Sequence, residues 1–280
     1  MFEVEFIGTG DAAGVPVWGC DCPACRRART DPARRRESAC VAVHTETGVT
    51  LIDAGVGDLA RRFDFGQIRR ILLTHFHMDH VQGLFPLRWC ERTPRIPVHR
   101  PDDPIGADDL YKHPGVFDFR PPLAPFIEHD LGDLRITPLP LRHSRPTQGY
   151  VLRHQRHRLA YLTDTAGLPE TTLHHLRRHP VDALVLDCHV PPQPRPPRNH
   201  NDLTTALALW RVTGAPRLWL THVGHHLDDW LRQPGNALPE GVRVAADGLR
   251  LAGDGQVRTT HRTSRRADAT RSSPEPRLAT

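Results

Sequence analysis

The chain has 280 residues, of which 38% are hydrophobic and 25% are charged, and it contains 27 prolines. This composition excludes wholesale disorder, and the length allows either two small domains or one large layered domain. There is no run of eighteen apolar residues and no secretory pattern at the N-terminus, so we expect a cytoplasmic protein without a membrane partner.

The net charge of +5 raises the question of nucleic-acid binding. Most of the excess lies from Gly255 onward, where six arginines face only Asp268 and Glu275. The rest of the chain is close to neutral. A nucleic acid is therefore not the expected main partner.

Short apolar runs recur along the chain and are typical of buried strands, with helical patterns between some of them. The expected strands are 4–7, 49–52, 71–73, 136–139, 159–162, 183–186 and 218–220. The expected helices are 79–89, 169–178 and 203–211, the last capped by Asn201 or Asp202. The proline-rich stretches 120–125 and 190–197 are expected to be loops. This order predicts an α/β fold without repeats.

Metal-capable side chains follow four of these strands. A His-x-His-x-Asp-His motif at 75–80 follows the strand at 71–73, and three later strands run into His143, Asp164 and His222. We expect these side chains to converge, because loops beyond strand ends meet in one crevice. Together they can reach two cations, with Asp164 as the natural bridging ligand. The pattern predicts metal-assisted hydrolysis of a phosphoryl or acyl group.

A second candidate metal site lies near the N-terminus. Three thiols fall within six positions: Cys20, Cys22 and Cys25. In a reducing compartment such crowding favours a metal over a disulfide, and a closed zinc site needs a fourth ligand. We prefer His225, because it lies three residues beyond His222 and one loop would then serve both sites. His226 and Cys40 are the alternatives.

The His-x-His-x-Asp-His motif, followed by His143, Asp164 and His222, resembles the signature of the metallo-β-lactamase superfamily. The resemblance implies that His75, His77 and His143 hold one ion, that Asp79, His80 and His222 hold the other, and that Asp164 bridges them. It also implies a single four-layer αββα sandwich over residues 1–253, which leaves 254–280 as an expected disordered basic tail. Asp53 resembles the carboxylate that orients a ligating histidine in this superfamily.

Longer segments narrow the resemblance to the phosphodiesterases of the carbon–phosphorus lyase pathway, over about residues 4–252. They are the Gly-Thr-Gly at 8–10 and the stretches 14–22, 77–89 and 163–169. This family opens 5-phosphoribosyl 1,2-cyclic phosphate to ribose 1,5-bisphosphate during phosphonate catabolism and also accepts 2′,3′-cyclic nucleotides. The resemblance implies a small cyclic phosphate as substrate. It also implies manganese at the two metal positions that share Asp164, here called the active pair.

The ligand types themselves suit zinc, nickel or iron as well as manganese at the active pair, beside one structural zinc at the cysteines. A homodimer is left open by the sequence.

His200 matches a histidine of the family that lies beside the metals without binding them. With Asp164 it completes the expected catalytic residues, and it would contact the phosphate or protonate the leaving ribose oxygen. The segment 187–189 departs from the family pattern, so His189 receives no role.

Three other functions stay open. An RNA-processing nuclease of the same fold is disfavoured by the near-neutral body and by the lack of a long RNA-binding arm. A thioester or lactam hydrolase is a further option. A non-catalytic relative in cofactor biosynthesis is disfavoured by the intact set of seven ligands.

Overall fold

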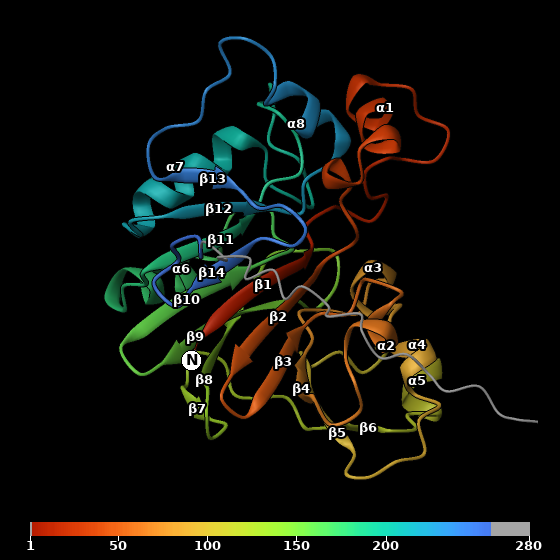
Figure 1. Cartoon of the computed structure of the whole chain (residues 1–280). Coiled ribbons are helices and arrows are strands. Elements are labelled where there is room, and N and C mark those ends of the chain that lie inside the picture. Colours follow the sequence, from red (N-terminus) through yellow and green to blue (C-terminus); the bar gives the residue numbers. More distant parts are fainter. Residues whose placement is uncertain (1, 259–280) are drawn as a thin grey trace, which may run out of the picture.

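The computed structural model describes residues 2–258 and folds them into two seven-stranded β-sheets that pack face to face, with helices on both outer sides (Figure 1). This is the expected four-layer αββα sandwich. Each described helix is too short or too polar to cross a membrane.

The two sheets have matching mixed topologies. The first sheet runs β14 (Arg250–Ala252), β1 (Glu3–Gly8), β2 (Cys40–Thr45), β3 (Gly48–Ile52), β4 (Ile68–Leu72), β5 (Ile96–His99) and β6 (Phe117–Phe119). The second runs β13 (Val242–Val244), β12 (Leu218–Thr221), β11 (Ala183–Asp187), β10 (His157–Leu162), β9 (Gln148–His154), β8 (Arg135–Pro140) and β7 (His129–Asp130). Strands β3 to β6 are parallel, as are β10 to β13, and the remaining pairs are antiparallel.

Most of the helices lie on one or the other outer face. They are α1 (Pro23–Thr30), α2 (Leu59–Arg62), α3 (Met78–Val81), α4 (Leu84–Leu87), α5 (Asp108–Lys112), α6 (Glu170–Arg178), α7 (Leu203–Thr213) and α8 (His225–Trp230), with a 3₁₀ turn at Pro32–Arg34. Leucines of α2, α4 and α5 join the core on the outside of the first sheet, whereas those of α6, α7 and α8 join the core outside the second.

Burial on both faces explains why the strands read as continuous apolar runs. In β11, Ala183 and Val185 lie in the core between the sheets, while Leu184 and Leu186 lie under the outer helices. All seven expected strands form, and the helices expected at 169–178 and 203–211 are confirmed. Asp202 caps α7 by accepting a hydrogen bond from the Thr205 N–H at 2.9 Å.

The single helix expected over 79–89 is wrong, because the chain forms the short helices α3 and α4 there. Gly83 lies between them and packs so closely against the segment after β3 that a Cβ on it would lie 2.2 Å from the Val56 carbonyl oxygen. Its N–H donates to the Ala54 carbonyl oxygen at 2.7 Å. Tertiary contact therefore overrides the helical pattern. The proline-rich segments 120–125 and 190–197 are loops, as expected.

The ordered chain continues past residue 253 along the edge of the first sheet. Leu251 pairs with Val257, and Trp219 Nε1 donates to the Gly255 carbonyl oxygen at 3.0 Å. The expected tail from 254 therefore begins with five residues that belong to the packed body. Residues 259–280, to which the rest of that expectation applies, lie outside the described residues.

Candidate metal centres

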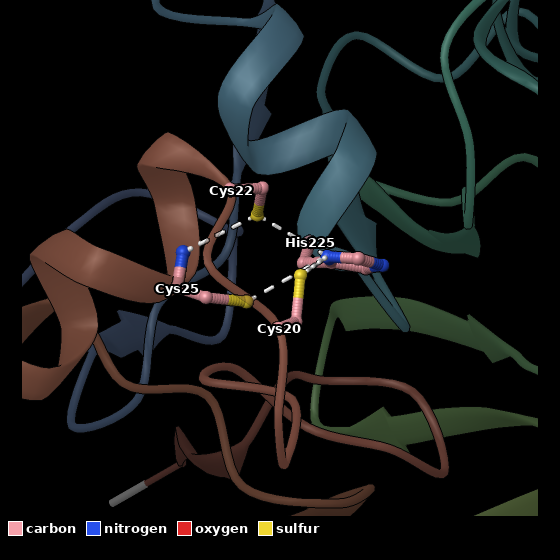
Figure 2. A group of neighbouring side chains, drawn as sticks. All are labelled: Cys20, Cys22, Cys25 and His225. Atoms are coloured by element: carbon pink, nitrogen blue, oxygen red, sulfur yellow. Dashed lines mark hydrogen bonds between the residues drawn. The ribbon is translucent and has the colours of Figure 1, made fainter.

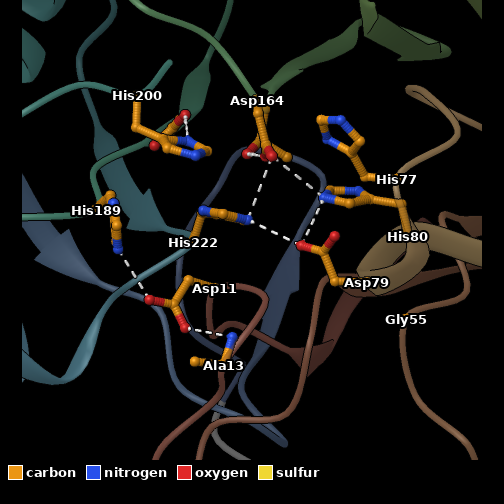
Figure 3. A network of polar contacts seen from close by, with 12 residues as sticks. Asp11, Ala13, Gly55, His77, Asp79, His80, Asp164, His189, His200 and His222 are labelled. Carbon is orange, nitrogen blue, oxygen red and sulfur yellow. Dashed lines mark hydrogen bonds and ion pairs between the residues drawn. The ribbon is translucent and has the colours of Figure 1, made fainter. Parts of the chain in front are cut away.

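One end of the sandwich collects the metal-capable side chains that follow β4, β8, β10 and β12 (Figure 3). They form two adjoining groups, within each of which the candidate ligand atoms lie no more than 4.8 Å apart. The first group is His75, His77 and His143, and the second is Asp79, His80, Asp164 and His222. The structure thus brings all seven residues of the sequence pattern to one place.

In the first group, three imidazole nitrogens converge. His77 Nδ1 lies 2.9 Å from His75 Nε2 and 3.1 Å from His143 Nε2. A tetrahedral ion with nitrogens at about 2.0–2.1 Å would hold those nitrogens about 3.3 Å apart. The spacing of these three nitrogens therefore fits a shared cation.

In the second group, two buried imidazoles face two carboxylates. The Nε2 atoms of His80 and His222 both lie 3.3 Å from Asp164 Oδ2. Neither Nε2 has a hydrogen-bond partner among the described residues, although both are buried. Buried polar atoms normally have partners, so these orphaned nitrogens fit metal ligands.

Asp164 Oδ2 also lies between the two groups. It is 3.7 Å from His75 Nε2 and 3.8 Å from His143 Nε2, in addition to its contacts with the second group. One carboxylate oxygen thus reaches histidines of both groups. This is the position that a ligand shared by two ions would require.

The charges in the second group reinforce each other. Burial by itself would raise the pKa of Asp164, but the neighbouring His222 and His80 hold it well below its usual value. For His222, burial opposes the charged form, yet Asp164 and Asp79 raise its pKa to about 9. The carboxylates thus favour positive charge at these imidazoles. A divalent cation bound between them would supply that positive charge.

Asp53, which follows β3, fixes the orientation of one of these histidines. His80 Nδ1 donates to Asp53 Oδ2 at 2.7 Å, and Thr74 donates to the same carboxylate from both N–H and Oγ1 at 2.8 Å. This leaves His80 Nε2 directed at the second group. Asp53 and His222 both have a φ of 59°, a left-handed conformation that is uncommon outside glycine and often marks functional sites.

His200 lies beside the cluster and is held by Asp187, at the end of β11. Its Nδ1 lies 2.9 Å from Asp187 Oδ2, and its ring stacks on that of His222 with centroids 4.8 Å apart. Burial would lower the pKa of His200, but Asp187 outweighs burial and raises it. Sequence reasoning missed Asp187, although it is a carboxylate directly after the expected strand 183–186.

The three cysteines gather around His225 (Figure 2). The Sγ atoms of Cys20, Cys22 and Cys25 lie 3.4, 3.3 and 3.6 Å from His225 Nδ1. A tetrahedral zinc with sulfur at about 2.3 Å and nitrogen at about 2.0–2.1 Å would hold them about 3.5 Å apart. The four residues therefore fit one closed zinc site.

Local structure explains how this cluster forms. Cys22 caps α1, and Pro23 begins that helix, so the loop before it brings Cys20 back toward Cys25. His225 is the first residue of α8. Of the two alternative ligands, Cys40 lies in β2, where its Sγ donates to the Asp53 carbonyl oxygen at 3.5 Å, and His226 takes no part in the group.

Comparison with known proteins agrees with this architecture. A family model described as "Beta-lactamase superfamily domain" matches residues 50–223. The crystal structure of "a New Diphosphatase from the PhnP Family" superposes with a TM-score of 0.73 at 27% identity, covering 90% of this chain and 98% of that one.

Two curated relatives are similar in sequence. An octanoyltransferase of Porphyromonas gingivalis is 26% identical over 262 residues, covering 87% of this chain and 50% of that protein. A ribonuclease Z of Methanopyrus kandleri is 30% identical over 158 residues, covering 52% of this chain and 48% of that protein. The chain thus spans about half the length of these two relatives.

Proposed function

Because the chain belongs to the metallo-β-lactamase superfamily, we propose that it is a dinuclear-metal phosphodiesterase that hydrolyses 5-phosphoribosyl 1,2-cyclic phosphate to ribose 1,5-bisphosphate in phosphonate catabolism. The observation that carries this proposal is the His200–Asp187 pair beside a complete set of seven candidate ligands. Cations that activate water and a proton donor for the leaving oxygen both favour the hydrolysis of a phosphate ester.

The seven candidate ligands have the nitrogen and carboxylate chemistry that manganese, zinc, nickel or iron accept, and manganese is the proposed metal. Two such ions would supply a nucleophilic water and neutralise charge on the phosphoryl oxygens. Asp164 would hold both ions, and Asp53 would keep His80 Nε2 directed at them.

His200 is the proposed acid. Since Asp187 engages Nδ1, the opposite nitrogen, Nε2, is the one available to the substrate. Asp187 raises the pKa of His200, which favours the protonated ring that an acid needs. That proton would pass to the ribose oxygen when its bond to phosphorus breaks.

A second reaction is favoured by one comparison. The PhnP-family protein is named a diphosphatase, and its structure covers 90% of this chain. A diphosphate presents the same phosphoryl group with a phosphate as the leaving group. Hydrolysis of a diphosphate bond is therefore the second candidate for the same cluster.

The cysteine cluster is proposed to bind one structural zinc, since four protein ligands leave no position for a substrate. We further propose that the substrate is a small molecule. Because one relative is a ribonuclease Z, a nucleic acid should also be tested as a substrate.

Turnover assays test these alternatives directly. The purified chain should be loaded separately with manganese, zinc, nickel and iron, and offered the cyclic ribose phosphate, a nucleoside diphosphate, a precursor tRNA and a thioester. We expect the highest kcat/KM on the cyclic phosphate, and the Asp164→Ala variant should be inactive in every arm. Preferred turnover of the precursor tRNA or the thioester would contradict the proposal.

A further inference from the structure

A second carboxylate–imidazole pair, Asp11 and His189, lies at the edge of the cluster of seven candidate ligands, in a segment with no role assigned so far. His189 Nε2 lies 2.9 Å from Asp11 Oδ2. The other oxygen of Asp11 accepts from the N–H groups of Ala13 and Gly14, both at 3.0 Å, so the carboxylate is fixed by its own loop. Figure 3 shows His189 between Asp11 and His200.

The backbone of His189 is also fixed on both sides. Its N–H donates to the Asn201 carbonyl oxygen at 2.9 Å, and its carbonyl oxygen accepts from the Gly224 N–H at 3.0 Å. The ring packs directly on Gly224, where a Cβ would lie 2.7 Å from His189 Cδ2 and 2.9 Å from Nε2. One edge of the ring, with Cδ2 and Nε2, is therefore covered by Gly224 and Asp11.

The opposite edge of the ring carries Nδ1, which has no hydrogen-bond partner within residues 2–258. The side chain is 32% exposed, so this edge is accessible. Which nitrogen of an imidazole holds the proton is set by the hydrogen bond that the other one makes. With Asp11 accepting the Nε2 proton, the neutral ring has an acceptor lone pair at Nδ1.

The position of His189 indicates which part of a substrate it would meet. Its ring centroid lies 5.0 Å from that of His200 and 6.2 Å from that of His222. His200 is the proposed donor to the leaving oxygen. The group attached to that oxygen would therefore lie beside His189.

We propose that His189, oriented by Asp11, is a substrate-binding residue that accepts a hydrogen bond at Nδ1 from a hydroxyl of the sugar on the leaving side of a phosphodiester. This inference rests on the proposed function, because it takes the leaving side from His200. Asp11 acts through His189 and is a positioning residue.

Two substrates separate this role from a structural one. 5-Phosphoribosyl 1,2-cyclic phosphate keeps a free hydroxyl on the sugar that carries its leaving oxygen, whereas bis(p-nitrophenyl) phosphate has no hydroxyl at all. We expect His189→Ala to raise KM for the cyclic ribose phosphate about tenfold with kcat changed less than about twofold, since one hydrogen bond is lost. Its kinetics on bis(p-nitrophenyl) phosphate should match the wild type.

Two conservative variants sharpen the test. Asparagine places a side-chain oxygen close to the position of Nδ1, whereas glutamine places its amide near the position of Nε2. We therefore expect His189→Asn to recover most of the KM and His189→Gln to behave like His189→Ala. His174→Asn, an exposed histidine on α6, is the matched control and should resemble the wild type.

Calorimetric titration with 3′-AMP, a product-like probe, gives a readout apart from turnover. We expect the metal-loaded His189→Ala protein to bind it about tenfold more weakly than the wild type. Equal losses on both substrates, better rescue by glutamine than by asparagine, or unchanged 3′-AMP binding would overturn the proposal. A wild type that binds 3′-AMP in a His189-dependent way but turns over neither substrate would leave this contact standing and overturn the proposed function.

Discussion

The two candidate metal centres are built in opposite ways. The active cluster draws seven residues from the ends of four strands and buries most of them. The cysteine cluster takes three ligands from one short segment around the start of α1 and only one from α8, which is distant in the sequence. The first has two adjoining groups that share Asp164, with His200 beside them. The second has four ligand atoms, which suffice to close a tetrahedron. The contrast supports the proposal that one centre serves chemistry and the other holds a loop.

The two centres are nevertheless neighbours in the sequence. His222 and His225 belong to different centres and are separated only by Val223 and Gly224. Val223 is anchored by its N–H, which donates to the Thr9 carbonyl oxygen at 2.9 Å. When one centre is disrupted, the metal content of the other centre should therefore be measured as well.

The largest expected effect comes from Asp164→Ala, which removes the carboxylate that contacts histidines of both groups. Phosphodiesterase activity should fall by about 10³-fold or more, because the charge stabilisation by both ions is lost. Elemental analysis should show the loss of the active pair, while zinc at the cysteines remains. A fully active variant would contradict the assignment of Asp164.

His200→Ala should be the next largest, because it removes the proposed acid and none of the seven candidate ligands. On a cyclic ribose phosphate, kcat should fall by about 10²–10⁴-fold with the metal content unchanged. On bis(p-nitrophenyl) phosphate the loss should be much smaller, since p-nitrophenolate leaves without a proton. Equal losses on the two substrates would assign His200 to phosphate binding.

Cys22→Ser tests the other centre. It should release the structural zinc, lower the melting temperature and loosen the loop at residues 18–27, because metal binding and folding are coupled at a closed site. Activity should fall only as far as the fold is disturbed, which activity and circular dichroism measured on the same samples can show. An unchanged melting temperature and zinc content would mean that the cysteines are simply reduced thiols.

The smallest effect is expected from truncation after Arg258, which removes no ligand of either centre. Melting temperature and activity on the cyclic phosphate should match those of the full chain. Truncation after Gly253 is the matched comparison, and it should be destabilising because it removes the Gly255 carbonyl oxygen that accepts from Trp219. A loss of activity in the chain that ends at 258 would show that the tail contributes to the site.

Much of the fold and the convergence of the seven candidate ligands could be predicted from the sequence, because buried strands and an HxHxDH motif leave local patterns. The seven apolar runs formed strands, but the other seven described strands were missed. One of them is β9, whose sequence from Gln148 to His154 has polar ends. The helix pattern at 79–89 failed because contact of Gly83 with the Val56 backbone decides the geometry there. Local sequence carries no sign of such a contact.

The parts of the site that were missed are pairs between distant residues. Asp187 engages His200 across 13 positions, and Asp11 engages His189 across 178. No periodicity or spacing rule links such residues, so only the folded chain brings them together. His225 could be preferred among three candidate zinc ligands because it lies near His222 in the sequence, but only the fold shows that the start of α8 lies beside the cysteines.

Metal stoichiometry during mild chelation tests the central claim most directly. The protein should be dialysed against a weak chelator while metal content, activity and far-ultraviolet circular dichroism are followed together. We expect two ions to leave first with complete loss of phosphodiesterase activity, while one zinc and the folded spectrum remain, and added manganese should restore turnover. Full activity after the pair has left, or loss of the cysteine-bound zinc before the pair without any change in stability, would contradict the account.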